Sequence, residues 1–167
     1  SIESGCYVNM NNGGELTIGK LPVGTKYVVE EDGYEAYTTQ VNGAEGRKAT
    51  GEIPAEGAEA EFVNTRKTTS FAVTKEWQGG EGGGIVLTLY ANGEKLDPQP
   101  EYTSAGGVYT YANLPEFTEA GDMIVYSAKE KYVDGYMTMY RNEAPYEDET
   151  DRVYNGGTII NRAVTEF

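Results

Sequence analysis

Apolar and polar residues alternate in short runs along most of the chain, which is typical of β-strands with one buried face. Val, Ile, Thr and Tyr are frequent in these runs, and no apolar period of 3.6 residues is sustained over three turns. Clusters of Gly, Pro, Asn and Asp separate the runs and indicate turns. The pattern predicts an all-β sandwich of antiparallel sheets. Strands are expected at residues 15–19, 26–31, 36–41, 60–64, 70–77, 85–91, 107–111, 123–130, 136–140 and 157–161.

A weak internal repeat divides the chain. In the first half, LTIGKLPVGTKYVVEEDGY is followed by EFVNTR; in the second, YTYANLPEFTEAGDMIVYSAKEKYVDGY is followed by TIINRA. Both halves contain a strand, Leu-Pro, a strand ending in glutamate, a Gly-Tyr step, and a strand ending in asparagine with arginine close behind. The glutamate and asparagine are 33 residues apart in the first half (Glu31, Asn64) and 31 in the second (Glu130, Asn161). We therefore expect two related modules, residues 1–67 and 68–167.

Three polar residues of the second half lie on strand faces that the alternation predicts to point into the core. In FAVTKEW, the residues on one face are Phe71, Val73, Lys75 and Trp77, so a lysine interrupts an apolar row. The same count places Glu130 with the inward residues of IVYSAKE, and Asn161 with those of TIIN. An ammonium, a carboxylate and a carboxamide are thus predicted to face one core.

Burial in a core is unfavourable for charged groups and favours the neutral amine and the neutral carboxylic acid. A neutral amine is a nucleophile, and a protonated acid that donates a hydrogen bond to a carboxamide makes its carbon electrophilic. Attack of Lys75 on Asn161 would release ammonia and leave an amide between two side chains. Glu130 would relay protons and survive unchanged, and no cofactor is required.

Charge and composition exclude several classes of function. The 27 acidic and 13 basic residues give a net charge of −14, which disfavours nucleic acid and anionic membranes as partners. Without histidine and with a single cysteine, the chain cannot form a serine–histidine relay, a zinc cluster or an internal disulfide. No apolar run approaches the roughly 18–20 residues needed to span a bilayer, and no leader opens the chain, so we expect a soluble or processed segment.

The second half resembles the B-type repeat domains of Gram-positive collagen adhesins and related sortase-assembled pilins. The resemblance covers residues 68–167 and rests on VTKEW, IVLTLYANGEKL, YANLP, YSAKE and TIIN. It implies an immunoglobulin-like β-sandwich with an autocatalytic isopeptide bond between Lys75 and Asn161, assisted by Glu130. The first half is similar to the C-terminal part of a streptococcal backbone-pilin domain, on GELTIGKLPVGTKYVVEEDGYEAYTT and AEFVNTRK. There the matching residues are Glu31 and Asn64.

The first half departs from the family pattern because it lacks a strand that would deliver a lysine. None of its lysines sits in the middle of an inward row: Lys20, Lys26, Lys48 and Lys67. We expect the missing first strand to lie upstream of Ser1 or to come from another chain. Glu31 and Asn64 are therefore predicted to be a relict site or one completed in trans, with no intramolecular bond at Asn64.

These observations favour a structural stalk or backbone module of a Gram-positive surface adhesin or pilin, not an enzyme that turns over. The resemblance implies an extracellular location, attached to the cell wall through a region outside this chain. Expected partners are other domains or subunits of the same surface protein or pilus. The alternative is an adhesin domain that binds a host matrix protein or a glycan.

Two further functions are disfavoured. The acidic run at residues 146–151 lacks the spaced ligands and turn glycine of a calcium loop, so a solvated loop is expected and no metal is predicted. A hydrolase with paired carboxylates is disfavoured because Glu130 has no second acid at matching depth.

Overall fold

The computed structural model describes residues 5–148 and 151–165. The described residues form strands, turns and loops without a helix, so none of them forms a helix that could cross a membrane. The chain divides into two compact units. The first unit runs to Gly33 and continues from Thr38 to Thr65, and the second comprises Tyr34–Tyr37 and the chain from Arg66 onward.

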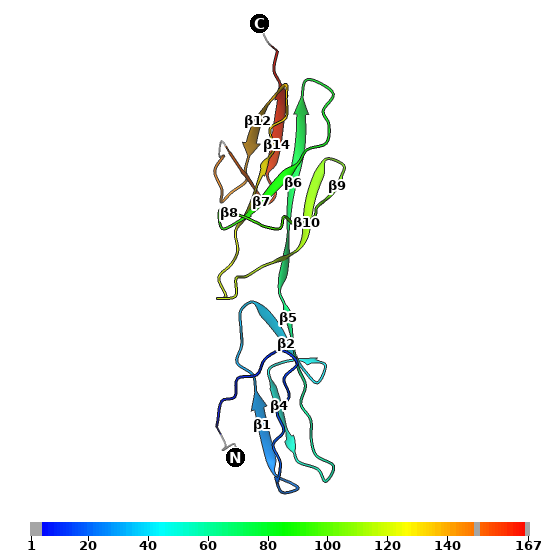
Figure 1. Cartoon of the computed structure of the whole chain (residues 1–167), viewed down its shortest axis with the longest axis vertical. Helices are drawn as coiled ribbons and strands as arrows, with labels where there is room; N and C mark the ends of the chain where they lie inside the picture. Colours follow the sequence, from blue (N-terminus) through cyan, green and yellow to red (C-terminus); the bar gives the residue numbers. More distant parts are fainter. Residues whose placement is uncertain (1–4, 149–150, 166–167) are drawn as a thin grey trace. The chain divides into compact units, whose positions relative to one another are not determined.

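The second unit is a sandwich of two sheets (Figure 1). One sheet has the strand order β12-β14-β6-β10-β9, and the other has the order β13-β11-β7-β8. The bounds are β6 (Thr68–Gln78), β7 (Leu87–Ala91), β8 (Glu94–Lys95), β9 (Thr103–Ala105), β10 (Val108–Pro115), β11 (Tyr126–Glu130), β12 (Tyr136–Arg141), β13 (Val153–Tyr154) and β14 (Thr158–Ala163).

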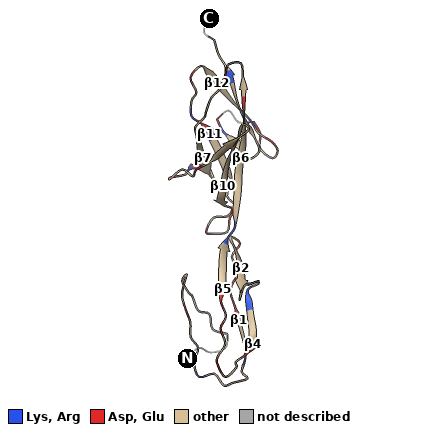
Figure 2. Ribbon diagram, turned by 90° about the vertical axis from the view of Figure 1, so that its right-hand side faces the viewer, with Lys and Arg blue, Asp and Glu red and all other residues tan. Residues whose placement is uncertain are grey.

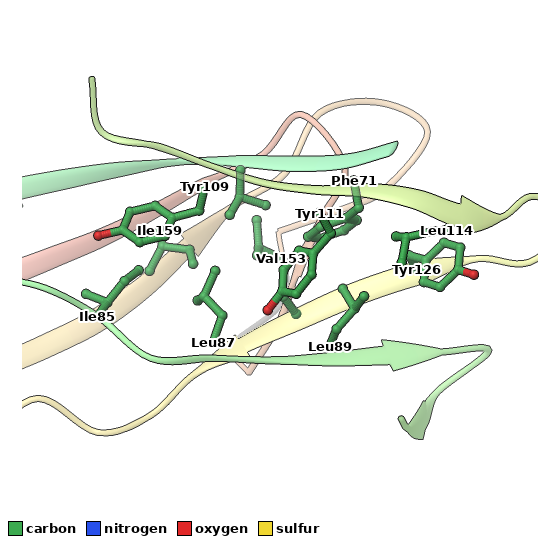
Figure 3. Close-up of a cluster of buried hydrophobic side chains, with 12 residues drawn as sticks. Phe71, Ile85, Leu87, Leu89, Tyr109, Tyr111, Leu114, Tyr126, Val153 and Ile159 are labelled. Carbon is green, nitrogen blue, oxygen red and sulfur yellow. The ribbon is translucent and has the colours of Figure 1, made fainter. Parts of the chain in front are cut away.

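The core of the second unit lies between these sheets. Phe71 on β6 and Tyr111 on β10 face Leu89 on β7 and Val153 on β13 (Figure 3). These four residues and Val73 on β6 are at most 1% exposed. Alternation in β6 buries every second residue from Phe71 to Lys75, as a strand with one core-facing side requires. The predicted all-β sandwich is confirmed.

The first and last strands of the second unit lie side by side and run parallel (Figure 1). In this register Lys75 on β6 is opposite Ile159 on β14, and Trp77 is opposite Asn161. Parallel neighbours cannot be joined by a tight turn, so the residues between them build the rest of the sandwich. The two strands that are far apart in sequence are thereby brought into direct contact.

The first unit contains a two-stranded sheet and a three-stranded sheet. The strands β1 (Lys26–Glu30) and β4 (Lys48–Glu52) pair antiparallel, and β2 (Tyr37–Val41) lies between β3 (Ala44–Glu45) and β5 (Phe62–Arg66). The second unit repeats this arrangement: β11 pairs with β13, and β12 pairs with β14. In chain order, β1, β2, β4 and β5 therefore correspond to β11, β12, β13 and β14.

The predicted strand at residues 15–19 is wrong, because these residues are not in a strand. By the repeat they correspond to part of β10, which pairs with β6 in the second unit. A strand requires a hydrogen-bonded neighbour, and no counterpart of β6 lies among the described residues of the first unit. The alternation of apolar and polar residues does not show whether a segment has such a neighbour.

The alternation also missed several strands: β3, β4, β8, β9 and β13. Four of these are two or three residues long, too short to show a period.

Figure 2 shows acidic and basic residues along both units of the chain. Acidic residues outnumber basic ones, 27 to 13.

Candidate functional site

The structure brings Lys75, Glu130 and Asn161 together from three strands of the second unit. Lys75 Nζ lies 3.2 Å from Glu130 Oε1, and Asn161 Nδ2 donates to the same oxygen at 3.2 Å. Lys75 comes from β6 and Asn161 from β14 in one sheet, while Glu130 ends β11 in the other. A single carboxylate oxygen thus contacts both the amine and the carboxamide across the sandwich.

All three side chains are buried. The side chains of Lys75 and Glu130 are 2% and 0% exposed, and Asn161 is 0% exposed. Burial lowers the pKa of the Lys75 ammonium below its ordinary value, and the neighbouring Glu130 carboxylate opposes this shift without cancelling it. The buried position therefore favours the neutral, nucleophilic amine more than solvent does.

Two atoms of the site lack an aligned hydrogen-bond partner among the described residues: Lys75 Nζ and Asn161 Oδ1. The amine is nevertheless within ion-pair distance of Glu130 Oε1, at 3.2 Å. Buried polar groups are rarely left unpaired, because each unmet hydrogen bond costs roughly 1–3 kcal/mol. These two groups are the ones that a reaction between Lys75 and Asn161 would transform.

Two residues that the sequence reasoning missed hold Glu130 in place. Thr138 Oγ1 donates to Glu130 Oε2 at 3.0 Å, and the Glu130 backbone N–H donates to the Tyr140 hydroxyl at 3.0 Å. Thr138 lies on β12 directly opposite Asn161. A signal for the threonine exists in the sequence: it follows Glu130 by eight residues, and Thr39 follows Glu31 by the same interval.

Aromatic side chains cover the amine. Lys75 Nζ lies 4.4 Å from the centre of the Trp77 ring, which packs edge-on against Tyr136 at 4.8 Å. The glycine-rich loop after β6 closes over both rings, since the Gly82 N–H lies 3.4 Å from the Tyr136 hydroxyl. A Cβ at Gly82 would be 2.9 Å from Trp77, and one at Gly80 would be 2.4 Å from the Tyr136 oxygen. Only glycine allows this close approach.

Glu31 and Asn64 are also brought together, in the first unit. Asn64 Nδ2 donates to Glu31 Oε1 at 2.6 Å, and Thr39 Oγ1 donates to Asn64 Oδ1 at 2.7 Å. The first-half lysines that have ion pairs bind other carboxylates: Lys26 with Glu52, Lys48 with Glu30, and Lys67 with Glu35. No lysine among the described residues completes this second cluster.

The acidic run at residues 146–151 forms no grouped metal ligands within the described part of the chain. Asp151 instead pairs with Lys129 and Arg152, and the hydrogen bond from Lys129 is the main reason that the pKa of this carboxyl is lowered. Glu149 and Thr150 lie outside the described residues.

The fold and the site together define an immunoglobulin-like β-sandwich whose first and last strands are adjacent. The family model of the Cna protein B-type domain matches residues 71–162, more than half of the chain, and the chain belongs to this family. Residues 1–66 match a family model described as a domain of unknown function (DUF7601). No curated protein and no solved structure matched the chain.

The family match confirms the resemblance seen in the second half of the sequence. Cna B-type domains occur in surface proteins of Gram-positive bacteria, which indicates an extracellular module of the adhesin or pilin class.

Proposed function

We propose that this chain is a stalk module of a cell-wall-attached surface protein, stabilised by an isopeptide bond between Lys75 and Asn161. The observation that carries the proposal is the buried contact of Glu130 Oε1 with both the amine and the carboxamide, each at 3.2 Å. The reaction occurs once in each molecule, so the chain is a self-modifying scaffold and not an enzyme that turns over. Its partners are other domains or subunits of the same surface assembly.

The reaction begins with a proton transfer from the Lys75 ammonium to Glu130. The two groups are already in contact, and the transfer replaces a buried ion pair by two neutral groups, which a desolvated site favours. A half-turn of the Asn161 amide exchanges Nδ2 for Oδ1 beside Glu130 Oε1. The protonated acid then donates to the carbonyl oxygen and polarises the carbonyl carbon.

The neutral amine attacks this carbon, forming the Nζ–Cγ bond. Glu130 then transfers the proton lost by the amine to Nδ2, the Cγ–Nδ2 bond breaks, and ammonia leaves. One amide is exchanged for another, so no oxidant or energy source is consumed. The adjacent strands β6 and β14 hold the reacting groups together and supply the effective concentration that a slow amide exchange needs.

The product would stabilise the second unit by restricting its unfolded chain. Lys75 and Asn161 are 86 residues apart, and loop-entropy arithmetic for disulfides gives roughly 4–5 kcal/mol for a crosslink of that span. A folded domain has a total stability of about 5–15 kcal/mol, so the increment is large. In a surface protein exposed to shear and proteases, this covalent crosslink has the further advantage that reducing agents do not cleave it.

Intact-mass measurement tests the proposal. The chain should be lighter than its sequence by one ammonia, and the substitutions Lys75→Ala, Asn161→Ala and Glu130→Gln should each restore the full mass. Fragmentation of a protease digest should recover residues 75 and 161 in one branched peptide.

A matched control is Lys129→Ala, which removes a neighbouring lysine whose ion pair with Asp151 is more exposed. This variant should still lose ammonia. A wild-type chain of full sequence mass, or a mass loss that persists in Lys75→Ala, would contradict the proposal.

A further inference from the structure

The chain contains four Asn-Gly steps, which are the positions where an asparagine amide is most easily lost. They are Asn12-Gly13, Asn42-Gly43, Asn92-Gly93 and Asn155-Gly156. Glycine has no side chain, so its backbone nitrogen can approach the side-chain carbon of the preceding asparagine and react with it. The asparagine side chain must first rotate toward this nitrogen. Contacts that hold the side chain in another direction therefore slow the reaction.

Two of the asparagines are held by a neighbouring segment of the backbone. Asn42 Oδ1 accepts a hydrogen bond from the Glu61 N–H at 2.9 Å, and Asn92 Oδ1 accepts one from the Val125 N–H at 2.9 Å. The backbone N–H of Asn42 donates in return to the Glu61 carbonyl oxygen at 2.9 Å, and that of Asn92 to the Val125 carbonyl oxygen at 2.8 Å. Rotation of either side chain toward its glycine would break a hydrogen bond.

Asn155 is held together with the glycine that follows it. The Ala72 N–H donates to Asn155 Oδ1 at 2.7 Å, and the Gly156 N–H donates to the Ala72 carbonyl oxygen at 2.8 Å. The carboxamide and the nitrogen that would attack it are thus both bound to one residue of β6. Two hydrogen bonds must break before these groups can react with each other.

Asn12 has no such restraint. It is exposed, and its side chain makes no hydrogen bond within the part of the chain that the structure describes. Its turn is closed by the backbone alone, through a hydrogen bond of 2.8 Å from the Gly14 N–H to the Asn11 carbonyl oxygen, with Gly13 at a φ of +73°. The Asn12 side chain can therefore rotate while the turn stays closed.

The exposure of this turn has a parallel in the complete sandwich of the second unit. The Leu-Pro step of the repeat follows Gly13 by eight residues in the first unit and Gly106 by eight residues in the second. Ala105, at the end of β9, therefore corresponds to Asn12, and it is exposed as well. An asparagine at this place in the fold is thus accessible to solvent even where both sheets are complete.

We propose that Asn12 is a site of spontaneous deamidation, at which the chain exchanges an amide for a carboxylate as it ages. The Gly13 nitrogen gives its proton to a base in the solvent and attacks Asn12 Cγ. The N–Cγ bond forms, the Cγ–Nδ2 bond breaks, and ammonia leaves with a proton from water, which produces a succinimide ring. Water then opens the ring at either carbonyl carbon and yields aspartate or isoaspartate. The net reaction consumes one water and releases one ammonia.

The modification changes both the charge and the backbone of the turn. Each event adds one negative charge to a chain whose net charge is −14. Isoaspartate also carries the chain through its side-chain carbon, which lengthens the backbone between Asn11 and Gly14. The reaction uses no residue of the isopeptide site and leaves a different mass, because crosslinking removes ammonia whereas deamidation replaces an amino group by a hydroxyl group.

Timed incubation of the full chain at mildly alkaline pH tests the proposal. Samples are digested with a protease that is active in acid, where deamidation is slow, and the peptides with the four Asn-Gly steps are separated and weighed. We expect the Asn12 peptide to convert to aspartyl and isoaspartyl forms about tenfold faster than the Asn155 peptide, whose hydrogen bonds must first break. In concentrated urea the rates should converge, since the protecting hydrogen bonds are absent there.

Two variants serve as controls. Ala105→Asn places an asparagine before Gly106 in the corresponding turn of the second unit, and this residue should convert at a rate similar to that of Asn12. Asn12→Gln lengthens the side chain, so that attack would form a larger and less favourable ring, and should abolish the fast conversion. A folded chain in which any of the other three asparagines converts as fast as Asn12, or in which Asn12 stays intact, would overturn the proposal.

Discussion

At the scale of the residue, the unusual feature is a lysine placed in a core with one acidic neighbour. Removing one partner of a buried ion pair typically destabilises a protein by about 3–5 kcal/mol, because the other charge stays buried. The proposed bond removes the buried positive charge altogether, since the Lys75 ammonium becomes the nitrogen of a neutral amide whose acyl group comes from Asn161. The reaction itself thus removes the unfavourable desolvation of the lysine charge.

Thr138 is predicted to position Glu130 for proton transfer. The substitution Thr138→Val keeps the shape and removes the hydrogen bond to Oε2, worth about 1 kcal/mol. We expect ammonia loss to slow by about fivefold but still reach completion, as followed by intact mass during cell-free synthesis. The control Thr103→Val changes an exposed threonine on β9 and should leave the rate unchanged. Equal rates for wild type and Thr138→Val would show that the hydroxyl has no such role.

The lowered pKa of Lys75 predicts a pH-dependent stability in a chain that cannot crosslink. In Asn161→Ala, the folded lysine releases its proton at lower pH than the unfolded lysine, whose pKa is 10.5. Between these two values the unfolded state binds more protons, so the free energy of unfolding should rise with pH. The slope cannot exceed about 1.4 kcal/mol per pH unit for one proton.

Urea unfolding between pH 6 and about 9.5 measures this slope and avoids the titration of tyrosines. The double variant Lys75→Met, Asn161→Ala lacks the titrating amine and should lose the rise. If both variants give the same slope, the Lys75 amine is not the group responsible.

At the scale of the element, alternation predicted the inward row of β6, whereas β11 and β14 each bury three consecutive residues and show no period of two. Phe71, Val73 and Lys75 are all buried as the period of two requires. The same reasoning failed at residues 15–19, where strand formation depends on a neighbour that the alternation does not report. The sequence did not predict the roles of Thr138 and Tyr140, because these roles depend on contacts between β12 and β11.

The loop after β6 is predicted to depend on glycine at position 82. Gly82 has a φ of +72°, and a Cβ there would meet the Trp77 ring at 2.9 Å. Gly82→Ala should therefore displace the loop or the ring and destabilise the second unit by about 1–3 kcal/mol, measured by urea unfolding in the Asn161→Ala background. The control Gly83→Ala, where a Cβ meets nothing within 4 Å, should change stability much less. Equal effects would contradict the packing argument.

At the scale of the whole molecule, two units of similar strand order differ in completeness. The second unit has its own core and the full set of reacting groups, whereas most large apolar residues of the first unit are uncovered. We expect their resistance to unfolding to differ accordingly.

Pulling on the two ends of the chain should reveal the proposed crosslink. In wild type, the 86 residues between Lys75 and Asn161 stay inside a covalent loop and add no length when the second unit is loaded. In Asn161→Ala they become extensible and should add about 300 Å of contour length. Single-molecule force spectroscopy measures this difference, and an equal contour gain in both chains would refute the crosslink.

Trp77 is the only tryptophan in the chain, and its ring lies against the nitrogen that the proposed reaction converts from a cation to an amide. Its indole emission therefore originates from one defined place, next to the group whose charge changes. The protein carries a native optical reporter of its own maturation, and an added dye or label is unnecessary to follow the process in real time.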